Sequence, residues 1–600
     1  MESLETLYSL EGRPCRNFTI FAYTNMIDPW DSKEKLVLAN FTPGGIGSII
    51  FIDSITGIGE SFELPGDSGA WGLVNWNNEK LIVGTCSQYA YLHSFDLKTR
   101  TWAESLKAPN EKYFWDMVEG SDGMIYGGTW PGCSLMRYDP NHHTLENVGR
   151  VSDNPKNLYS RYLHAGLPGY IFITYGYDKA AISAFHMESG TFRDFGMPGY
   201  RVREVTDAFI ALEKLDNERD LVFYHPDTFE RISDDAGLAE RLTPRAVLLP
   251  NGKPNRVKKL TDGRMAGIRG QDYFILDHPE QQVELRRIPV EAPPTAIHSM
   301  IADENGMIWG CTGLGQTIFS YDPATGAFWN SSGVCDAGGE VYGMQFAGGR
   351  LFMSAYVGGD HIVYDPKLPW DQLYNHNPKT LRPAGPDFIR PEGRSVIGPD
   401  GGFWTGWSAK YGTYGGALSR VDPDTLEVGI WADPVPEQQI CGLTADDKYL
   451  YFTTNGGASG LAYKNVPNHF GVWSPEKGLV HLHRFEENVM AGNAVLAAGG
   501  RVFVGAGASI RIFDPITMSF VAERTIDDTC SWMVILSEKA MGVFSGNRLL
   551  VMDPDDLSII HIIPTPGLVR TAVVTETQHL YFAVDAALYR CKVSELNPGR

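Results

Sequence analysis

The segment Tyr321-Asp322-Pro323-Ala324-Thr325-Gly326 ends a short run of apolar and aromatic residues, and the same phrase returns along most of the chain. Such a phrase ends a β-strand, because proline offers no N–H to a neighbouring strand and the aspartate side chain bonds the backbone ahead of it. Further copies have their aspartate at residues 139, 365, 422, 514 and 553, and weaker copies stand at residues 53, 96, 186, 225, 277 and 474. Successive copies are 39 to 57 residues apart, which is the length that four antiparallel strands require.

A second phrase lies upstream in the same repeats, an Asp-Gly, Asn-Gly or Gly-Gly turn followed by an aromatic and apolar strand. Asn305-Gly306-Met307-Ile308-Trp309 is one example. Turns of this kind join antiparallel strands, since their positive φ values match the strand twist. The two phrases together predict an all-β chain of about thirteen four-stranded blades. Because single rings usually close with four to eight blades, the predicted fold class is tandem β-propellers, with two rings of six to seven blades.

The domain boundary is predicted from a proline-rich segment at residues 289–295, after which a clear repeat begins at Ile297. This places a first β-propeller over residues 1–290 and a second over residues 291–600. The last repeat, from Arg570, lacks a fourth strand before the chain ends. The N-terminal segment, residues 6–10, is the candidate to supply that strand and so to close the last blade.

Composition limits the partners of the chain. Hydrophobic residues at 43% and charged residues at 20% are ordinary for a globular protein, and the net charge is −21. With no run of Lys and Arg, nucleic acid and anionic membranes are not expected as partners, whereas a small molecule or an oligosaccharide is. The acidic start lacks the pattern of a signal peptide, and the eight cysteines are scattered without a C-x-x-C pair. We therefore expect a cytoplasmic protein with reduced thiols.

Aromatic residues are concentrated in the longer loops, which converge on one face of a propeller. Rings flanked by amides and hydroxyls suit the C–H faces and hydroxyls of a sugar, and the alternative is that they fill the space between blades. The candidate substrate-binding residues are Trp115, Trp130, Tyr159, Tyr356 and Trp407.

The first strands of the blades carry the candidate catalytic residues, His164, His298, Tyr342, Arg161 and Arg394. Histidine is suited to proton transfer near neutral pH, and arginine binds a carboxylate through two N–H groups. Strand alternation places Arg161 and His164 on different faces. The alternative for each histidine is a strand residue that bonds a neighbouring blade.

Several chemistries have no motif in the chain. G-x-S-x-G, the P-loop and H-E-x-x-H are absent, which removes serine hydrolase, nucleotide-binding and zincin interpretations. His481 and His483 share one face of a predicted strand, but no carboxylate partner is evident nearby. A divalent metal therefore stays open as a cofactor, with its ligands unknown.

Residues 397–404 (Ile-Gly-Pro-Asp-Gly-Gly-Phe-Trp) and 302–309 (Ala-Asp-Glu-Asn-Gly-Met-Ile-Trp) resemble the repeats of streptogramin-lyase and SMP-30-like β-propellers, and are similar to those of propeller-type polysaccharide lyases. The resemblance concerns blade architecture over most of the chain. It implies β-elimination, in which a base removes a proton next to a carboxylate while arginine or a metal stabilises the enolate. His164 or His298 would then be the base, Arg161 or Arg394 the neutralising group and Tyr342 the acid for the leaving oxygen.

The predicted function is accordingly a carbohydrate-active lyase that cleaves uronate-containing oligosaccharides. Two alternatives remain open at this stage. One is a propeller scaffold that binds a ligand or a protein without catalysis. The other is a glycoside hydrolase with paired carboxylates, for which Asp116 and Asp360 are the candidates.

Overall fold

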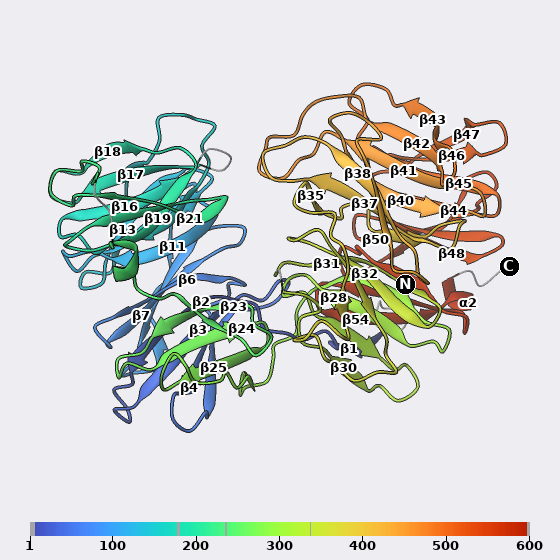
Figure 1. Cartoon of the computed structure of the whole chain (residues 1–600). Coiled ribbons are helices and arrows are strands. Elements are labelled where there is room, and N and C mark those ends of the chain that lie inside the picture. The colour runs from blue at the N-terminus through green and yellow to red at the C-terminus, as the bar shows by residue number, and fades with distance from the viewer. Residues whose placement is uncertain (1–6, 177–179, 234–236, 337, 597–600) are drawn as a thin grey trace. The chain divides into compact units, whose positions relative to one another are not determined.

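The computed structural model describes residues 7–176, 180–233, 237–336 and 338–596, and strands dominate it (Figure 1). In that part of the chain the strands form thirteen sheets, nine of them four-stranded, and helix is limited to η1 (Ala239–Arg241) and α2 (Val593–Leu596). Neighbouring strands in the sheets pair antiparallel, as β2 with β3 and β3 with β4 do. The prediction of an all-β fold built from repeated four-stranded antiparallel sheets is confirmed.

The chain divides into two compact units. Residues 18–292 form one, called here the six-sheet unit, and residues 1–17 with 293–600 form the other, called the seven-sheet unit. The first residues thus belong with the second half of the chain, because β1 (Ser9–Gly12) pairs with β54 (Ala587–Lys592) as the outermost strand of the last sheet. Residue 6 of the segment expected to do this lies outside the described residues.

The strands of the six-sheet unit are β2 (Ile20–Ile27), β3 (Glu34–Asn40), β4 (Ser48–Asp53) and β5 (Gly59–Glu63); β6 (Ala70–Trp76), β7 (Lys80–Thr85), β8 (Tyr91–Asp96), β9 (Thr101–Trp102) and β10 (Leu106–Lys107); β11 (Tyr113–Glu119), β12 (Ile125–Trp130), β13 (Ser134–Asp139) and β14 (Thr144–Arg150); β15 (Ser160–His164), β16 (Tyr170–Tyr175), β17 (Ala181–His186) and β18 (Thr191–Gly196); β19 (Tyr200–Val205), β20 (Ile210–Lys214) and β21 (Asn217–Tyr224); and β22 (Ala246–Leu248), β23 (Pro254–Lys259), β24 (Met265–Arg269), β25 (Asp272–Leu276) and β26 (Arg286–Arg287).

Besides β1 and β54, the seven-sheet unit contains β27 (Ile297–Ala302), β28 (Ile308–Thr312), β29 (Ile318–Tyr321) and β30 (Phe328–Asn330); β31 (Val341–Ala347), β32 (Arg350–Ala355), β33 (Asp360–Tyr364) and β34 (Lys379–Thr380); β35 (Phe388–Arg390), β36 (Ser395–Ile397), β37 (Phe403–Ala409), β38 (Gly416–Val421) and β39 (Val428–Ala432); β40 (Gln439–Ala445), β41 (Leu450–Asn455), β42 (His469–Ser474) and β43 (Gly478–Arg484); β44 (Ala491–Ala498), β45 (Arg501–Ala506), β46 (Ser509–Asp514) and β47 (Ser519–Thr525); β48 (Cys530–Ser537), β49 (Ala540–Ser545), β50 (Arg548–Met552) and β51 (Ile559–Pro564); and β52 (Ala572–Val574) with β53 (His579–Val584).

The core lies between consecutive sheets, so the middle strands are apolar on both faces. Every residue of β4 is buried, whereas β5 at the edge of the same sheet is mostly exposed. Phe51 on β4 and Phe95 on β8 of the next sheet belong to one apolar cluster, with 6.1 Å between their ring centroids. Each sheet therefore depends on its neighbours for burial, which explains why a sequence repeat of this length forms a compact unit.

The Asp-Pro phrases form the turns predicted for them. The Asp322 carboxylate accepts hydrogen bonds from Ala324 N at 2.9 Å and Thr325 Oγ1 at 2.8 Å. The equivalent aspartates at residues 53, 96, 139, 365, 422, 514 and 553 each accept a bond from the backbone N–H two residues ahead.

In the seven-sheet unit the first strands of successive sheets contact each other in the order β27, β31, β36, β40, β44, β48 and β52, and β52 in turn contacts β27. A cavity of about 210 Å³ lies among these strands, and its lining includes Gln345, Arg394 and Trp532. The lining comes from the middle of these strands, as with Ser299 to Ile301 in β27 and Gly343 to Gln345 in β31, whereas His298 and Tyr342 lie nearer the strand starts and are not part of it.

Candidate active site

A β-bulge with one extra residue recurs in the first strands of both units of the described chain. In β27, for example, Ile297 pairs with Thr312 and Ser299 with Cys311, so His298 is an extra residue without a partner across the ladder. A bulge redirects a side chain and is frequent next to functional sites. The extra residues are Phe21, Trp71, Trp115, Arg161 and Arg203 in the six-sheet unit, and His298, Tyr342, Cys441 and Ser531 in the seven-sheet unit.

At two of the bulges, tight packing requires the glycine that follows the extra residue. A Cβ atom on Gly343 would lie 2.2 Å from Ser395 Oγ and 2.7 Å from Ser395 N. A Cβ atom on Gly72 would lie 2.8 Å from Met117 Cγ. Glycine thus lets the strand lie directly against the next sheet while the residue before it, Tyr342 or Trp71, leaves the ladder.

His298 and Tyr342 occupy the bulges of two neighbouring sheets and contact each other. Their ring centroids are 4.6 Å apart at an interplanar angle of 70°. His298 Nε2 is buried without a hydrogen-bond partner. Burial, and then the positive charges of Arg394, Arg570 and Arg390, lower the pKa of His298 to about 3. The imidazole is therefore neutral at physiological pH and has a lone pair available to accept a proton.

Tyr342 is the complementary group. Burial, followed by the nearby carboxyls of Glu340 and Glu392, raises the pKa of Tyr342 well above its ordinary value, so the phenol keeps its proton. Its oxygen accepts a hydrogen bond from Arg390 Nη1 at 3.0 Å. Because this bond uses the oxygen as acceptor, the O–H remains able to donate.

Arg390 organises three tyrosines. Besides Tyr342, its guanidinium donates from Nη2 to Tyr411 Oη at 3.2 Å and lies over the Tyr356 ring, 4.0 Å from the ring centroid. Tyr356 and Tyr411 are hydrogen-bonded to each other through their hydroxyls. Tyr356, expected from the sequence as a substrate-binding residue, is thus placed beside the His298 and Tyr342 pair through Arg390.

Two further arginines surround His298. Arg394 donates to the His298 carbonyl oxygen and to the Arg570 carbonyl oxygen, both at 3.4 Å, and its guanidinium lies 4.6 Å from the Trp532 ring centroid. Arg394 is held with φ at 60°, a left-handed conformation that is uncommon for a residue other than glycine. Arg570 is exposed. The site therefore presents fixed positive charge next to a neutral base.

Two carboxyls complete the cluster. Burial, with the nearby Glu392 charge adding to it, raises the pKa of Glu340 to about 7, although Arg390 opposes the shift. Burial also raises the pKa of Glu392, whose carboxylate lies 3.9 Å from Arg390 Nε. Glu340 consequently carries a proton below neutral pH.

The candidates in the six-sheet unit are arranged differently. The Arg161 guanidinium lies over the rings of Trp115 and Tyr162, at 5.1 and 5.2 Å from their centroids. His164 stands at the other end of β15. Burial lowers its pKa to about 4; the charge of Glu213 opposes this shift, and the charges of Arg201 and Arg203 add to it. Asp116 accepts backbone hydrogen bonds from Met117 and Leu163, and burial raises its pKa to about 6.

The two carboxylates considered for a glycoside hydrolase belong to different units. Asp116 is in the six-sheet unit and Asp360 is in the seven-sheet unit. Trp407, expected to bind substrate, is fully buried: its Nε1 donates to Ser419 Oγ at 2.7 Å and its ring meets that of His361. It packs between its own sheet and the preceding one, because His361 belongs to β33. His481 and His483 pack on phenylalanine rings, Phe513 and Phe520 respectively.

Aromatic candidates in the six-sheet unit do meet. The rings of Tyr113 and Trp130 are stacked with centroids 4.7 Å apart, and Tyr159 lies 5.4 Å from Trp115 and 6.1 Å from Trp130. Tyr159 and the two tryptophans are each partly exposed.

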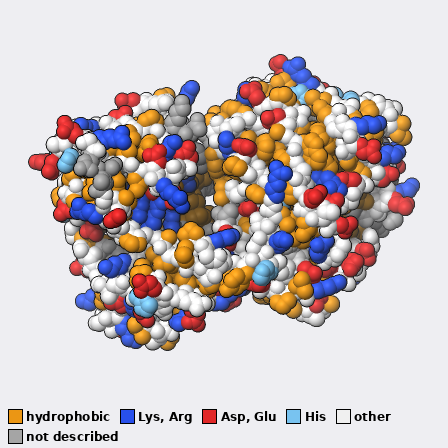
Figure 2. All heavy atoms as spheres, in the orientation of Figure 1, with side chains coloured by type: hydrophobic (Ala, Val, Ile, Leu, Met, Phe, Trp, Pro, Cys, Tyr) orange, Lys and Arg blue, Asp and Glu red, His pale blue; other side chains and the backbone are white. Residues whose placement is uncertain are grey.

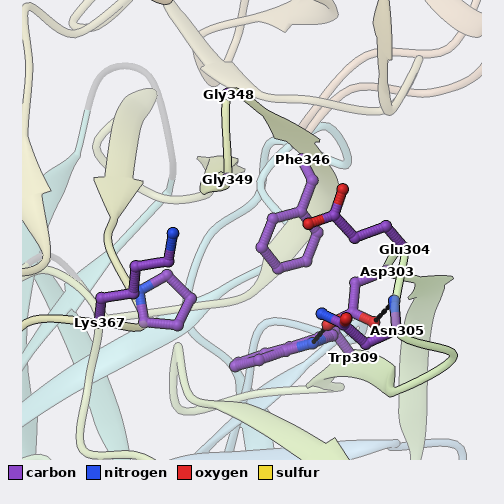
Figure 3. A pocket seen from close by; sticks show the side chains of 9 residues that line it. Asp303, Glu304, Asn305, Trp309, Phe346, Gly348, Gly349 and Lys367 are labelled. Atoms are coloured by element: carbon purple, nitrogen blue, oxygen red, sulfur yellow. Dashed lines mark hydrogen bonds between the residues drawn. The ribbon is translucent and has the colours of Figure 1, made fainter.

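A second cavity, of about 490 Å³, lies at the far end of β27 from His298. Figure 3 shows the rings of Trp309 and Phe346 lining it, with Lys367 across from Asp303 and Glu304. Asp303 accepts a hydrogen bond from Trp309 Nε1 at 3.1 Å, so its carboxylate is engaged in holding the β27–β28 turn. On the visible face of each unit, acidic and basic side chains are intermixed (Figure 2).

Within residues 7–176, 180–233, 237–336 and 338–596, no group of three or more His, Cys, Asp or Glu side chains is arranged to hold a metal ion. Over the same residues, no helix is long and apolar enough to span a membrane.

Sequence reasoning identified His298, Tyr342 and Arg394 but missed Arg390, Glu340, Glu392 and Tyr411. Glu340 and Glu392 stand in loops before β31 and β36, Tyr411 follows β37, and Arg390 ends the short strand β35, so the repeat phrases give no guide to them. The sequence does contain a signal for some of the bulges. It is a side chain followed by glycine near the start of a first strand, as in Trp71-Gly72, Tyr342-Gly343 and Cys441-Gly442.

Neither a known protein family nor a curated protein matches the sequence. Among solved structures, the chain is similar to the extracellular domain assigned to a hybrid two-component system of B. thetaiotaomicron, with 14% identity, a TM-score of 0.32, and coverage of 96% of this chain and 75% of that one. It is also similar to an extracellular domain assigned to a one-component system of the same organism, with 11% identity, a TM-score of 0.27, and coverage of 98% and 83%.

Proposed function

We propose that each unit is a β-propeller and that the seven-sheet unit is a carbohydrate-directed lyase, which cleaves acidic oligosaccharides by β-elimination. The fold part of the proposal rests on the contacts among the first strands from β27 to β52 and back to β27. The site lies where these strands begin, at the mouth of the ring, which is a usual location for ligand binding in such folds.

One observation carries the chemistry: a neutral imidazole with an unpartnered Nε2 contacts a phenol that keeps its proton, next to three arginines. Elimination next to a carboxylate needs these groups together. It needs a base in its deprotonated form, which for an imidazole is the neutral one, an acid for the departing oxygen and fixed positive charge for the enolate.

The steps follow from the roles of the side chains. Arg394 and Arg570 bind the carboxylate of a uronate residue. His298 Nε2 removes the proton from the carbon next to that carboxylate, and the electron pair forms an enolate that the arginines stabilise. The carbon–carbon double bond then forms as the bond to the glycosidic oxygen breaks. Tyr342 gives its proton to that oxygen, and the proton on His298 returns to the phenolate through solvent.

The substrate class follows from the same charges. A neutral sugar has no group that requires the guanidinium groups around His298, and its ring C–H bonds are too weakly acidic for an imidazole to deprotonate. The carboxylate of a uronate satisfies both conditions, because it pairs with arginine and acidifies the neighbouring C–H bond. The hydroxyls of Tyr356 and Tyr411 are placed to contact the sugar hydroxyls beside it.

The test is a digestion of saturated galacturonate, mannuronate and glucuronate-containing hexasaccharides by the purified full chain. Ultraviolet absorbance detects the unsaturated product, and mass spectrometry determines whether water has been added. Elimination gives absorbing products whose masses sum to that of the substrate.

Products that contain one added water and do not absorb would overturn the lyase assignment and favour hydrolysis, for which Glu340 and Glu392 would be the acid and base candidates. Saturable binding without cleavage of any of the three acidic substrates would overturn the catalytic proposal in favour of a binding scaffold.

A further inference from the structure

Three of the bulges in the six-sheet unit carry Phe21, Trp71 and Trp115, whereas two of those in the seven-sheet unit carry His298 and Tyr342. Phe21 and Trp71 are stacked, with centroids 3.8 Å apart at 13°, and Trp71 meets Trp115 edge to face at 4.9 Å. Tyr113 and Trp130 pair across β11 and β12. With Tyr159, these six residues form a continuous array from four successive sheets, called here the aromatic platform.

The platform differs from the rings of the core. Phe114, next to Trp115 in β11, and Tyr126 on β12 are both fully buried. None of the six platform residues is fully buried, and Phe21 is 40% exposed. Single exposed rings are ordinary, but a contiguous partly exposed set is typical of a binding surface.

Positive charge rims the platform. The Arg161 guanidinium lies 5.1 Å from the Trp115 ring centroid, and Lys112 Nζ lies 5.6 Å from the Trp130 ring centroid. Lys112 is exposed, although the chain as a whole is strongly acidic. Aromatic faces pack against the C–H faces of sugar rings, and ammonium and guanidinium groups pair with carboxylates.

The two carboxyl groups next to the platform residues in sequence, Glu111 and Asp116, are engaged with backbone N–H groups. Glu111, which precedes Lys112, is buried and accepts a hydrogen bond from Gly132 N at 2.9 Å, so it fixes the loop that follows Trp130. Asp116 faces inward, with its carboxyl bonded to backbone N–H groups. The chemistry that fits the platform is therefore a chain of sugar rings bearing carboxylates.

We propose that the aromatic platform of the six-sheet unit is a second, non-catalytic site that binds acidic oligosaccharides. The platform binds through its ring faces, and Arg161 and Lys112 select for carboxylates. This inference does not depend on the proposed lyase activity, since it requires no residue of the seven-sheet unit. If both hold, the platform retains polymer near the catalytic unit.

The experiment is calorimetric titration of the full chain carrying His298→Ala, so that substrate is not consumed. The probes are saturated hexagalacturonate and hexamannuronate, with maltohexaose as the neutral control. In this background Trp71→Ala and Trp130→Ala are each expected to raise Kd for the acidic probe roughly 3- to 10-fold. Trp30→Ala is the matched control, because Trp30 is 65% exposed in the same unit and outside the platform.

Arg161→Gln and Lys112→Gln remove the positive charges and leave the aromatic rings in place, so they test the proposal without the tryptophan variants. Each is expected to weaken binding of the acidic probe severalfold and to reduce its dependence on salt, with maltohexaose unaffected.

Absence of binding to both acidic probes would overturn the proposal. So would equal affinity in Trp71→Ala, Trp130→Ala and Trp30→Ala. A third result would be binding that is abolished by Arg394→Gln and unchanged in the platform variants. It would assign the binding to the seven-sheet unit, overturn the platform proposal and leave the proposed lyase site unaffected.

Discussion

The His298 imidazole meets the Tyr342 ring edge to face across two neighbouring sheets, with 4.6 Å between their centroids. Both are the extra residue of a β-bulge in a first strand. Trp71 and Trp115 occupy the equivalent bulges of two successive sheets in the other unit and meet in the same manner, at 4.9 Å and 87°. The same kind of bulge thus brings adjacent side chains into contact in both units, a histidine and a tyrosine in one and two tryptophans in the other.

The first prediction concerns the base. His298→Ala should lower the elimination rate by roughly 10²- to 10⁴-fold, because the neutral imidazole that contacts Tyr342 is removed. His561→Ala, an exposed residue of β51, is the matched control. Initial rates of product absorbance measure the effect. Unchanged activity in His298→Ala together with its loss in His164→Ala would move the base to the six-sheet unit.

The second prediction concerns the acid. Tyr342→Phe should lower kcat by about 10²- to 10⁴-fold on a natural glycoside, since the departing alkoxide would have no proton donor. A substrate with a nitrophenoxy leaving group needs no donor, so its cleavage should be nearly unaffected. Tyr374→Phe, with an exposed ring in the same unit, controls for the substitution. An equal loss on both substrates would mean that Tyr342 has another role.

The third prediction concerns pH. Because burial raises the pKa of Glu340 to about 7, its carboxyl becomes charged as pH rises from 6 to 8. The new negative charge would repel an acidic substrate and compete for Arg390, so KM should rise about 3- to 10-fold over this range with kcat little changed. Glu340→Gln should give a KM that is flat with pH. A rise that persists in Glu340→Gln would assign the ionisation to another group.

The repeat phrases allowed the all-β class and the four-stranded sheets to be predicted, because Asp322 and its equivalents make local turn bonds that the sequence alone determines. The alternation of side chains along a strand does not reveal the bulges. An extra residue such as Arg161 reverses the face assigned to every later residue of its strand. Trp407 and Trp115 look alike in sequence, and only packing against His361 makes the first fully buried. The cytoplasmic location and the absence of nucleic acid or membrane partners stay predictions.

The fourth prediction tests the bulge itself. Gly343→Ala would place a Cβ atom 2.2 Å from Ser395 Oγ and 2.7 Å from Ser395 N, so the strand must shift. We expect a stability loss of about 1–3 kcal/mol and a fall in activity of at least about 10-fold, because Tyr342 moves with the strand. Gly492→Ala is the control, since its Cβ atom would have open space. Chemical unfolding and initial rates measure both effects, and wild-type activity in Gly343→Ala would separate the bulge from the site.

The fifth prediction uses a histidine outside the site. His361 Nε2 is bonded to Ser419 Oγ at 2.7 Å and Nδ1 to the Arg382 carbonyl oxygen at 2.8 Å. Burial lowers its pKa from 6.5 to about 4. Between these values the unfolded chain binds a proton that the folded chain does not, so this histidine makes the fold less stable as pH falls from 6.5 to 4.

The full shift corresponds to roughly 3 kcal/mol. His361→Gln cannot take up that proton, because its amide stays neutral. The variant should therefore lose roughly 3 kcal/mol less stability than the native chain between pH 7 and pH 4, whatever its stability at pH 7. Urea unfolding at several pH values measures the difference in slope, with His561→Gln as the control for an exposed histidine. Parallel profiles for His361→Gln and the native chain would show that His361 is protonated in the folded state, and that its bond to Ser419 is made by a donating Nε2.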